Sequence, residues 1–97
     1  MTTVIVHHSV TDYDTWKPVF DEHGVARAAN GCESVAIYRD AAEPNSLTVV
    51  TEWPSLDAAQ AFVSDPALKE AMSRAGVTGP PEIHIIDLVD SAVGAGV

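Results

Sequence analysis

Residues 47–69, LTVVTEWPSLDAAQAFVSDPALK, decide the fold, because they contain a strand followed by two consecutive helix starts. Leu47 to Trp53 is rich in β-branched and apolar residues and predicts a strand. Ser55 provides an N-cap for a helix. The predicted inner face of this helix includes Leu56, Ala59 and Phe62. Asp65-Pro66 interrupts the helix and starts a second segment, with Asp as N-cap and Pro in first position. This second segment is predicted to stop at Gly76.

The residues before this stretch predict the same order of elements. Val4 to Val10 predicts a strand, and capping side chains follow it at Thr11, Asp12 and Asp14. Apolar and functional side chains then recur every three or four residues, as expected for one face of a helix: Tyr13, Trp16, Phe20, His23 and Arg27. Pro18 is expected in or near the first turn, where its missing N–H costs little. Asn30-Gly31 ends the helix. Glu33 to Arg39 then predicts a strand that forms a hairpin with Leu47–Trp53.

The remaining residues complete an α+β domain predicted over residues 1–90. Gly79-Pro80-Pro81 is expected to lead into a last strand, Glu82 to Val89, and residues 91–97 are expected to form a flexible tail. The order β-α-β-β-α-β with right-handed crossovers predicts a four-stranded antiparallel sheet with the helices on one face.

The other face of the sheet predicts a homodimer. A 97-residue domain has a thin core, yet 46% of its residues are hydrophobic. Val4, Val6 and their neighbours make both sides of the predicted sheet apolar. One chain has helices for only one side, so we expect two sheets to pack face to face.

Charge and composition exclude several kinds of partner. The net charge of −9 disfavours nucleic acids and anionic membranes, whose binding depends on Lys and Arg. No apolar run approaches the roughly 20 residues of a membrane helix. Cys32 is the single cysteine, which excludes an internal disulfide, and its simplest interpretation is a packed thiol. With no signal-peptide pattern at the N-terminus, we expect a cytoplasmic protein.

The histidines give no metal-binding spacing, so no metal is expected. His7 and His8 are adjacent on a strand and must point to opposite faces, although the sequence does not say which of them faces the helices. His84 is expected near the start of the last strand, where one of the two could lie opposite it. Three structural histidines are the simpler interpretation of this set.

His23 and Arg27 share the predicted helical stripe with Trp16 and Phe20. His23 is either a core-edge histidine bonded to backbone or a pocket histidine that moves protons, since imidazole ordinarily titrates near pH 6.5. Arg27 is either a solvated helix end or a residue that binds a carboxylate or enolate oxygen. The aromatic residues are mainly core candidates, but they also suit a flat apolar pocket.

The third strand and the helix after it resemble the dimeric α/β-barrel superfamily, which has a ferredoxin-like fold. The resemblance covers residues 3–89 and is closest to its antibiotic-biosynthesis-monooxygenase branch. It rests on Thr51-Glu52-Trp53-Pro54-Ser55 and on the residues that follow: Ala58, Ala59, Phe62, Ser64, Pro66, Leu68 and Lys69. The superfamily also includes heme-degrading enzymes, in which a strand Asn, a Trp and a helix His form the site. Trp53 matches that Trp and His8 stands at the Asn position. The helix His is replaced by Met72 or a neighbour, so heme degradation is not expected.

The resemblance implies a cofactor-independent monooxygenase that acts on an aromatic or polyketide-like substrate. His23 or His8 would remove a proton, and Arg27 would stabilise the resulting anion. The expected substrate-binding residues are Trp16, Phe20, Trp53, Tyr13 and His84. A cyclase or isomerase of the same fold, and a non-catalytic ligand-binding or stress-associated protein, remain alternatives.

Overall fold

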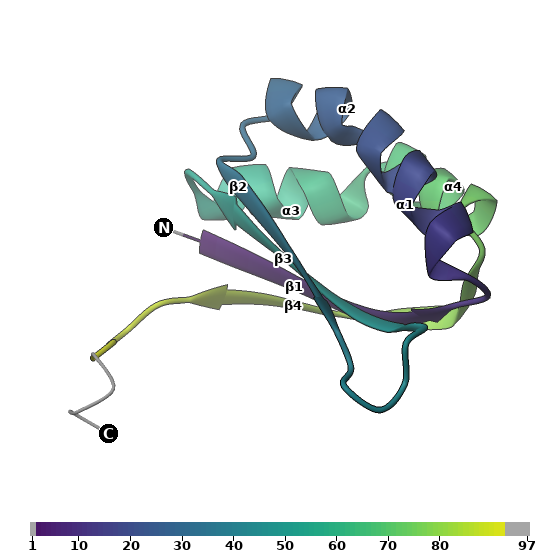
Figure 1. The fold of residues 1–97 in the computed structure, drawn as a ribbon. Coiled ribbons are helices and arrows are strands. Elements are labelled where there is room, and N and C mark those ends of the chain that lie inside the picture. The colour runs from purple at the N-terminus through teal and green to yellow at the C-terminus, as the bar shows by residue number, and fades with distance from the viewer. Residues whose placement is uncertain (1, 93–97) are drawn as a thin grey trace.

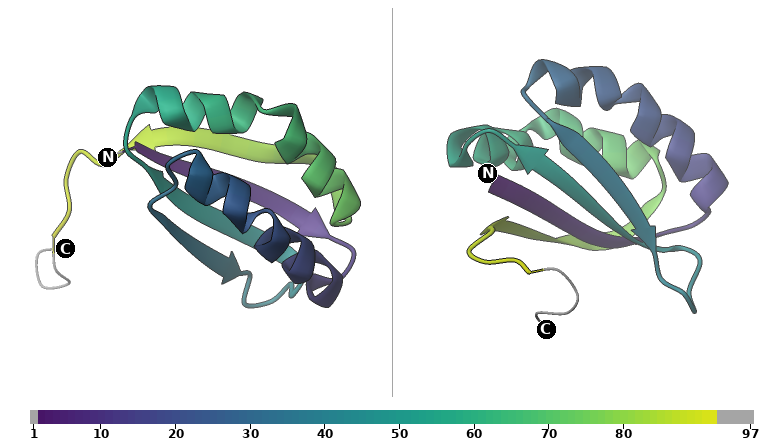
Figure 2. Two further views of the ribbon diagram at one scale, coloured as in Figure 1. Left: turned by 90° about the horizontal axis from the view of Figure 1, so that it is seen from above. Right: turned by 60° about the vertical axis from the view of Figure 1, so that its left-hand side comes forward.

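The computed structural model describes residues 2–92 and consists of one sheet with helices on one side (Figure 1). The elements in chain order are β1 (Thr2–Val10), α1 (Tyr13–Glu22), α2 (Gly24–Ala29), β2 (Ser34–Arg39), β3 (Ser46–Trp53), α3 (Leu56–Ser64), α4 (Pro66–Arg74) and β4 (Val77–Asp87). Two helical arms, α1–α2 and α3–α4, cross the same face of the sheet (Figure 2). The predicted α+β class is confirmed.

The sheet has the ferredoxin-like strand order β2-β3-β1-β4, and all three pairings are antiparallel. β1 lies in the centre, where Val4 is opposite Thr51 of β3 and Ile85 of β4. Even-numbered residues of β1 face the helices, because side chains alternate along a strand. This alternation decides which of the two adjacent histidines reaches the covered side.

The first helical arm is broken at His23, between α1 and α2. The break precedes Gly24, a residue with low helix propensity. Pro18 is the sixth residue of α1, so the expectation that it lies in or near the first turn is only loosely met. The helix begins at Tyr13, because the backbone N–H groups of Thr15 and Trp16 bond to the carbonyl of Asp12.

The second helical arm begins and restarts at the predicted residues. Ser55 Oγ accepts from the N–H of Ala58, and Asp65 Oδ1 accepts from the N–H of Ala67. The predicted inner face is wrong at Leu56, which is 49% exposed. Leu56 is the first residue of α3, whereas the buried residues of this helix are Ala59 and Phe62.

The last strand begins earlier than predicted, at Val77 instead of Glu82, and ends at Asp87. Val77 and Thr78 pair with Val10 and Ser9, so Gly79-Pro80-Pro81 lies inside the strand as an irregularity in its register. Proline is tolerated here because β4 is an edge strand, where an N–H can be missing without loss of a pairing bond. Gly79 has a φ of 72°, a conformation that other residues rarely adopt.

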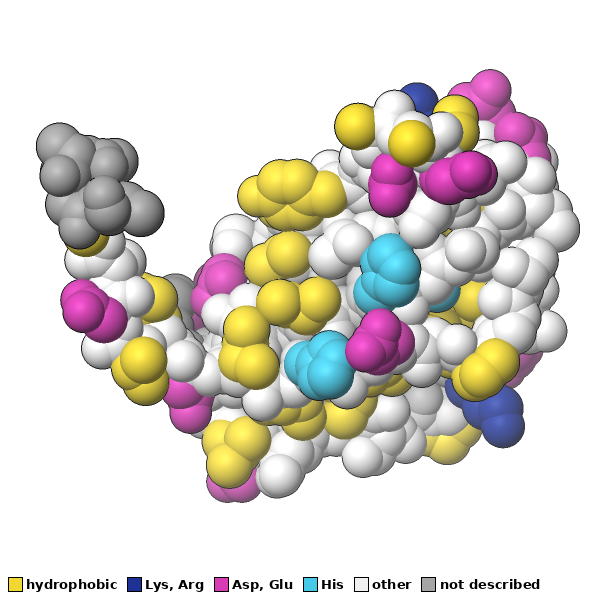
Figure 3. Space-filling view, turned by 90° about the horizontal axis from the view of Figure 1, so that it is seen from below, with side chains coloured by type: hydrophobic (Ala, Val, Ile, Leu, Met, Phe, Trp, Pro, Cys, Tyr) yellow, Lys and Arg dark blue, Asp and Glu magenta, His cyan; other side chains and the backbone are white. Residues whose placement is uncertain are grey.

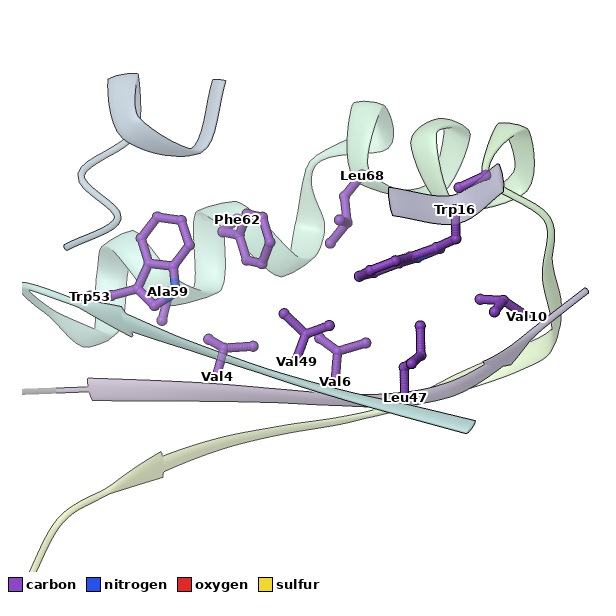
Figure 4. Packing of buried hydrophobic residues seen from close by; sticks show 11 residues of the cluster. Val4, Val6, Val10, Trp16, Leu47, Val49, Trp53, Ala59, Phe62 and Leu68 are labelled. Carbon is purple, nitrogen blue, oxygen red and sulfur yellow. The ribbon is translucent and has the colours of Figure 1, made fainter. Parts of the chain in front are cut away.

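The core lies between the covered face of the sheet and the two helical arms. Figure 4 shows side chains from β1 and β3 pointing towards Trp16, Phe62 and Leu68 of the helices. Trp53 is fully buried, with its ring 4.6 Å from that of Phe62, and its Nε1–H donates to Thr51 Oγ1 at 2.8 Å.

The opposite face of the sheet is uncovered and mixed in character. It includes exposed or half-buried apolar side chains, with Tyr38 at 59% and Ile86 at 44% exposure. It also carries Glu52, which accepts from Thr3 Oγ1 at 2.8 Å, and His84, whose Nε2 lies 3.2 Å from a Glu82 oxygen. Figure 3 shows hydrophobic, histidine and acidic side chains gathered on this face. We call it the open face.

Residues 88–92, which follow β4, extend away from the body of the domain (Figure 1). Of the predicted tail, residues 91–97, only Ser91 and Ala92 belong to the described part, and they have no regular structure. Residues 93–97 lie outside it. Within residues 2–92, no helix has the length and hydrophobicity needed to span a bilayer.

Candidate functional site

A pocket lies between the helical arms and the covered face of the sheet. Strands β1 and β3 form its floor, and all four helices contribute to its walls. Most of the lining side chains are apolar, including Val6, Val49, Phe62, Leu68 and Met72. Its enclosed space measures about 50 Å³. An apolar lining with a few polar groups is typical of small-molecule sites.

Four side chains form a continuous array along one wall. The rings of Trp16 and Phe20 stack with centroids 4.8 Å apart. The rings of His8 and Trp16 meet edge to face, with their centroids 5.8 Å apart. The Arg27 guanidinium lies over Phe20, with Cζ 3.7 Å from the ring centroid. The helical spacing of Trp16, Phe20 and Arg27 produces this wall, because they share one face of the α1–α2 arm.

His8 is the histidine of β1 that faces the helices, whereas His7 is exposed on the open face beside Thr48. The side chain of His8 is 6% exposed, and its Nδ1 has no hydrogen-bond partner. Burial lowers the pKa of His8, with a smaller opposing effect from its own backbone carbonyl and a further lowering by His7. The neutral imidazole is therefore favoured.

His23 lies at the junction of α1 and α2 and lines the same pocket. Its backbone N–H still bonds to the carbonyl of Val19, so the ring position follows the helical stripe. The Nε2 atom is buried without a partner. The interpretation of His23 as a histidine that is hydrogen-bonded to the backbone therefore does not hold for Nε2.

Arg27 is buried at 7% exposure, so the interpretation as a solvated helix end is wrong. The reason is its place on the helical face of Trp16 and Phe20, where the guanidinium lies over the Phe20 ring. Gly24 leaves room for the guanidinium, since a Cβ there would lie 3.3 Å from Arg27 Nη2. Burial lowers the pKa of Arg27, and the nearby Cys32 and Asp21 partly oppose this shift. An arginine stays protonated even so.

The pocket contains three buried polar atoms without partners. Across residues 2–92, buried side-chain nitrogen and oxygen atoms that lack a hydrogen bond are found at His8 Nδ1, His23 Nε2 and Arg27 Nε. All three residues line the pocket. Unsatisfied buried groups are rare in folded proteins, so each of these atoms calls for a partner such as a water molecule or a ligand.

Three of the predicted binding residues do not line this pocket. Trp53 is buried in the core against Phe62, and Tyr13 packs on Trp16 and under the Arg39 guanidinium. His84 is exposed on the open face, opposite Ile5 rather than either histidine of β1. Its place in a pocket between the first helix and the sheet is therefore wrong, because the register of β4 directs it to the other side.

The structure adds lining residues that were not singled out from the sequence. Thr51 and Val49 line the floor, and Leu68, Ala71 and Met72 of α4 form the wall facing α1. The alternation of β3 places Thr51 on the same face as Trp53, and the spacing of the α4 residues is helical. These periodicities can be seen in the sequence, but they do not distinguish a pocket wall from a filled core.

The fold and this pocket define a small ferredoxin-like protein with an apolar site between helices and sheet. The sequence profile of the family described as antibiotic biosynthesis monooxygenase matches residues 6–74. The chain therefore belongs to the antibiotic biosynthesis monooxygenase family. A comparison with curated proteins gave no match.

Solved structures with the same fold include SnoaB from Streptomyces nogalater, described as a cofactor-independent oxygenase. It superposes with a TM-score of 0.77 at 17% identity, covering 95% of this chain and 96% of SnoaB. A putative antibiotic biosynthesis monooxygenase from Caulobacter crescentus CB15 gives 0.73 at 22% identity, with 92% and 90% covered. One from Bordetella bronchiseptica gives 0.72 at 20%, with 91% and 96% covered. At these identities the likeness shows the fold alone.

The arrangement places two imidazole rings and one positive charge around an apolar pocket. Trp16 and Phe20 stack on each other, and Arg27 provides the fixed positive charge beside Phe20. Among residues 2–92, no group of three or more histidine, cysteine or acidic side chains is arranged to hold a metal ion.

Proposed function

We propose that the protein is a cofactor-independent monooxygenase that acts on an aromatic or polyketide-like substrate in the pocket under α1. The observation that carries the proposal is the convergence of three unpartnered polar atoms, from His8, His23 and Arg27, in an otherwise apolar pocket. Membership of the antibiotic biosynthesis monooxygenase family supports the class of reaction.

The proposed chemistry begins with proton transfer from a phenol or enol of the substrate. His8 is the first candidate for the base, because its Nδ1 is buried in the pocket and has no other partner. His23 is the second candidate. Arg27 stabilises the anion that forms. The anion then reduces dioxygen; one oxygen atom enters the substrate and the other leaves as water.

Oxygen uptake with 1-naphthol or a naphthoquinol tests this function. We expect uptake by the wild-type protein and a loss of about 10²-fold or more in His8→Gln or in His23→Gln, in line with the usual contribution of a general base. His7→Gln changes the neighbouring exposed histidine and should retain activity. Wild-type turnover no greater than that of both pocket variants would reject the proposal.

The same experiment under anaerobic conditions separates the alternatives. A monooxygenase forms no product without oxygen, whereas a cyclase or isomerase would form product equally well. Binding of a naphthol without any product in air would indicate a ligand-binding protein instead.

We also propose that the protein functions as a homodimer joined through the open face. The supporting observation is the apolar component of that face, which includes the half-buried Ile5 and Val50 and the exposed Tyr38 and Ile86. No helix of the described chain covers these side chains, since both helical arms lie on the other side of the sheet (Figures 1 and 2).

A further inference from the structure

The enclosed space of the pocket is smaller than an aromatic ring requires. It measures about 50 Å³, whereas a cavity of about 150 Å³ holds one benzene molecule. The floor offers no further room, because Val6, Val49 and Thr51 belong to the hydrogen-bonded strands β1 and β3. An aromatic ligand can therefore enter only if a side chain of the wall moves.

Phe20 occupies the position from which a ring-sized space can be freed. Its own ring stacks on Trp16 with the centroids 4.8 Å apart, and Arg27 Cζ lies 3.7 Å from its centroid. A phenyl side chain has the size of one benzene ring. If this ring leaves, the pocket gains space for one ligand ring, bordered by an indole and a guanidinium that both bind aromatic faces.

Phe20 is also the aromatic side chain of the wall that is free to move. Trp16 and Phe62 line the pocket as well, but both are buried, whereas Phe20 is half-buried and has access to solvent. It lies in the last turn of α1, three residues before the helix is broken at His23. In a helix a long side chain has two common χ1 rotamers, so Phe20 can turn outward without a change in the backbone.

We propose that Phe20 is a gate: its ring takes the place of a ligand ring in the free protein and turns towards solvent when an aromatic ligand binds against Trp16 and Arg27. The proposal rests on the proposed function for its choice of site, and it names the residue that limits which ligands enter. The closed gate lowers the apparent affinity, because only the fraction of molecules with the gate open can bind.

Fluorine NMR of the wild-type chain tests the movement. The sequence has two phenylalanines, so protein labelled with 4-fluorophenylalanine gives two signals, and Phe20→Leu assigns them. We expect a water-soluble paramagnetic reagent to broaden the Phe20 signal at least twofold more when phenol saturates the protein. The Phe62 signal should stay protected in both states. Unchanged broadening of the Phe20 signal with phenol bound, or no binding of phenol to the wild type, would overturn the proposal.

Calorimetric titration with phenol tests the effect of the gate on affinity. We expect Phe20→Ala to bind phenol roughly tenfold or more tightly than the wild type, because its ligand no longer has to break the contacts of Phe20 with Trp16 and Arg27. Phe20→Leu, whose side chain fills less of the space, should lie between the two. Equal affinities of Phe20→Ala and the wild type would contradict the proposal.

The matched control is Tyr13→Ala. Tyr13 is on the same helix and its ring is 5.9 Å from that of Trp16, but it does not line the pocket. This variant should bind phenol with the affinity of the wild type. A gain as large as that of Phe20→Ala would indicate a general loosening around Trp16 and would reject the gate.

Thermal stability provides a readout that remains valid if Phe20→Ala is only marginally folded. Loss of the ring should lower the melting temperature, because it leaves a cavity. Phenol should then raise the melting temperature of Phe20→Ala more than that of the wild type or of Tyr13→Ala, because it binds the folded state more tightly. An equal rise in all three proteins would mean that Phe20 only fills the core, and the proposal would fail.

These outcomes are distinguishable from those of the oxygenase proposal, because none of the measurements depends on turnover. Movement of Phe20 on phenol binding without oxygen uptake in the presence of 1-naphthol would support the gate and reject the monooxygenase. Oxygen uptake with 1-naphthol, together with equal phenol affinities of the wild type and Phe20→Ala, would support the monooxygenase and reject the gate.

Discussion

At the scale of single residues, the burial of His8 couples stability to pH. Burial lowers the pKa of this side chain, whereas in the unfolded chain it titrates at about 6.5. When the pH falls through 6.5, the unfolded chain binds a proton that the folded protein does not yet bind. The folded state therefore loses stability over the interval between 6.5 and the lower folded pKa.

The variant His8→Gln should remove this dependence. As the pH falls from 8 to 5, we expect the unfolding free energy of the wild type to decrease relative to that of His8→Gln. Urea denaturation at each pH measures it, and the difference cancels the carboxylates common to both proteins. His7→Gln, at the exposed neighbour, should retain most of the wild-type dependence. A difference that is constant across this range would contradict the assignment.

The three pocket residues also show how far single positions can be predicted from sequence. The shared stripe of Trp16, Phe20, His23 and Arg27 is visible as a helical period, and this period persists through the break before Gly24. The burial of Arg27 is not visible in the same way, because a charged residue near a helix end is usually solvated. It depends on the packing of the guanidinium over Phe20 inside the pocket, which only the folded molecule shows.

At the scale of elements, the α3–α4 arm is held by its caps. Asp65 ends one helix and starts the next, and its side chain accepts from the N–H of Ala67. Asp65→Ala should lower the unfolding free energy by about 1 kcal/mol, the usual cost of losing an N-cap. Glu70→Ala removes the same charge from an exposed position of α4 and should cost less. Equal losses in the two variants, measured by urea denaturation, would argue against the cap.

Helix starts could be predicted from local signals, whereas the pairing of the strands could not. Ser55 and Asp65-Pro66 are local signals, so the helix starts follow from the sequence. The place of His84 depends on the pairing of β4 with β1, and the irregularity at Gly79-Pro80-Pro81 shifts that register. Register is set by contacts between distant residues, so the pairing of His84 with Ile5 could not be predicted. The alternation Glu82-Ile83-His84-Ile85 does favour opposite faces for His84 and the two isoleucines.

At the scale of the whole molecule, the open face determines the state of association. If two copies pack through it, a charge at its centre should separate them. We expect the wild-type protein to sediment as a dimer at micromolar concentration and Ile5→Glu to sediment as a folded monomer. Val25→Glu, which places the same charge on an exposed apolar position of α2, should leave the dimer intact. A wild-type protein that sediments as a single subunit would exclude the homodimer.

The two consecutive prolines of β4 affect how the edge of the sheet can associate with other molecules. An edge strand normally presents a row of free amide donors on which an extended segment of another molecule can assemble, and growth of this kind leads to aggregates. Pro80 and Pro81 lack those donors, and the irregular register around them bends the strand. We therefore expect this end of the edge to be a poor template for fibrous growth.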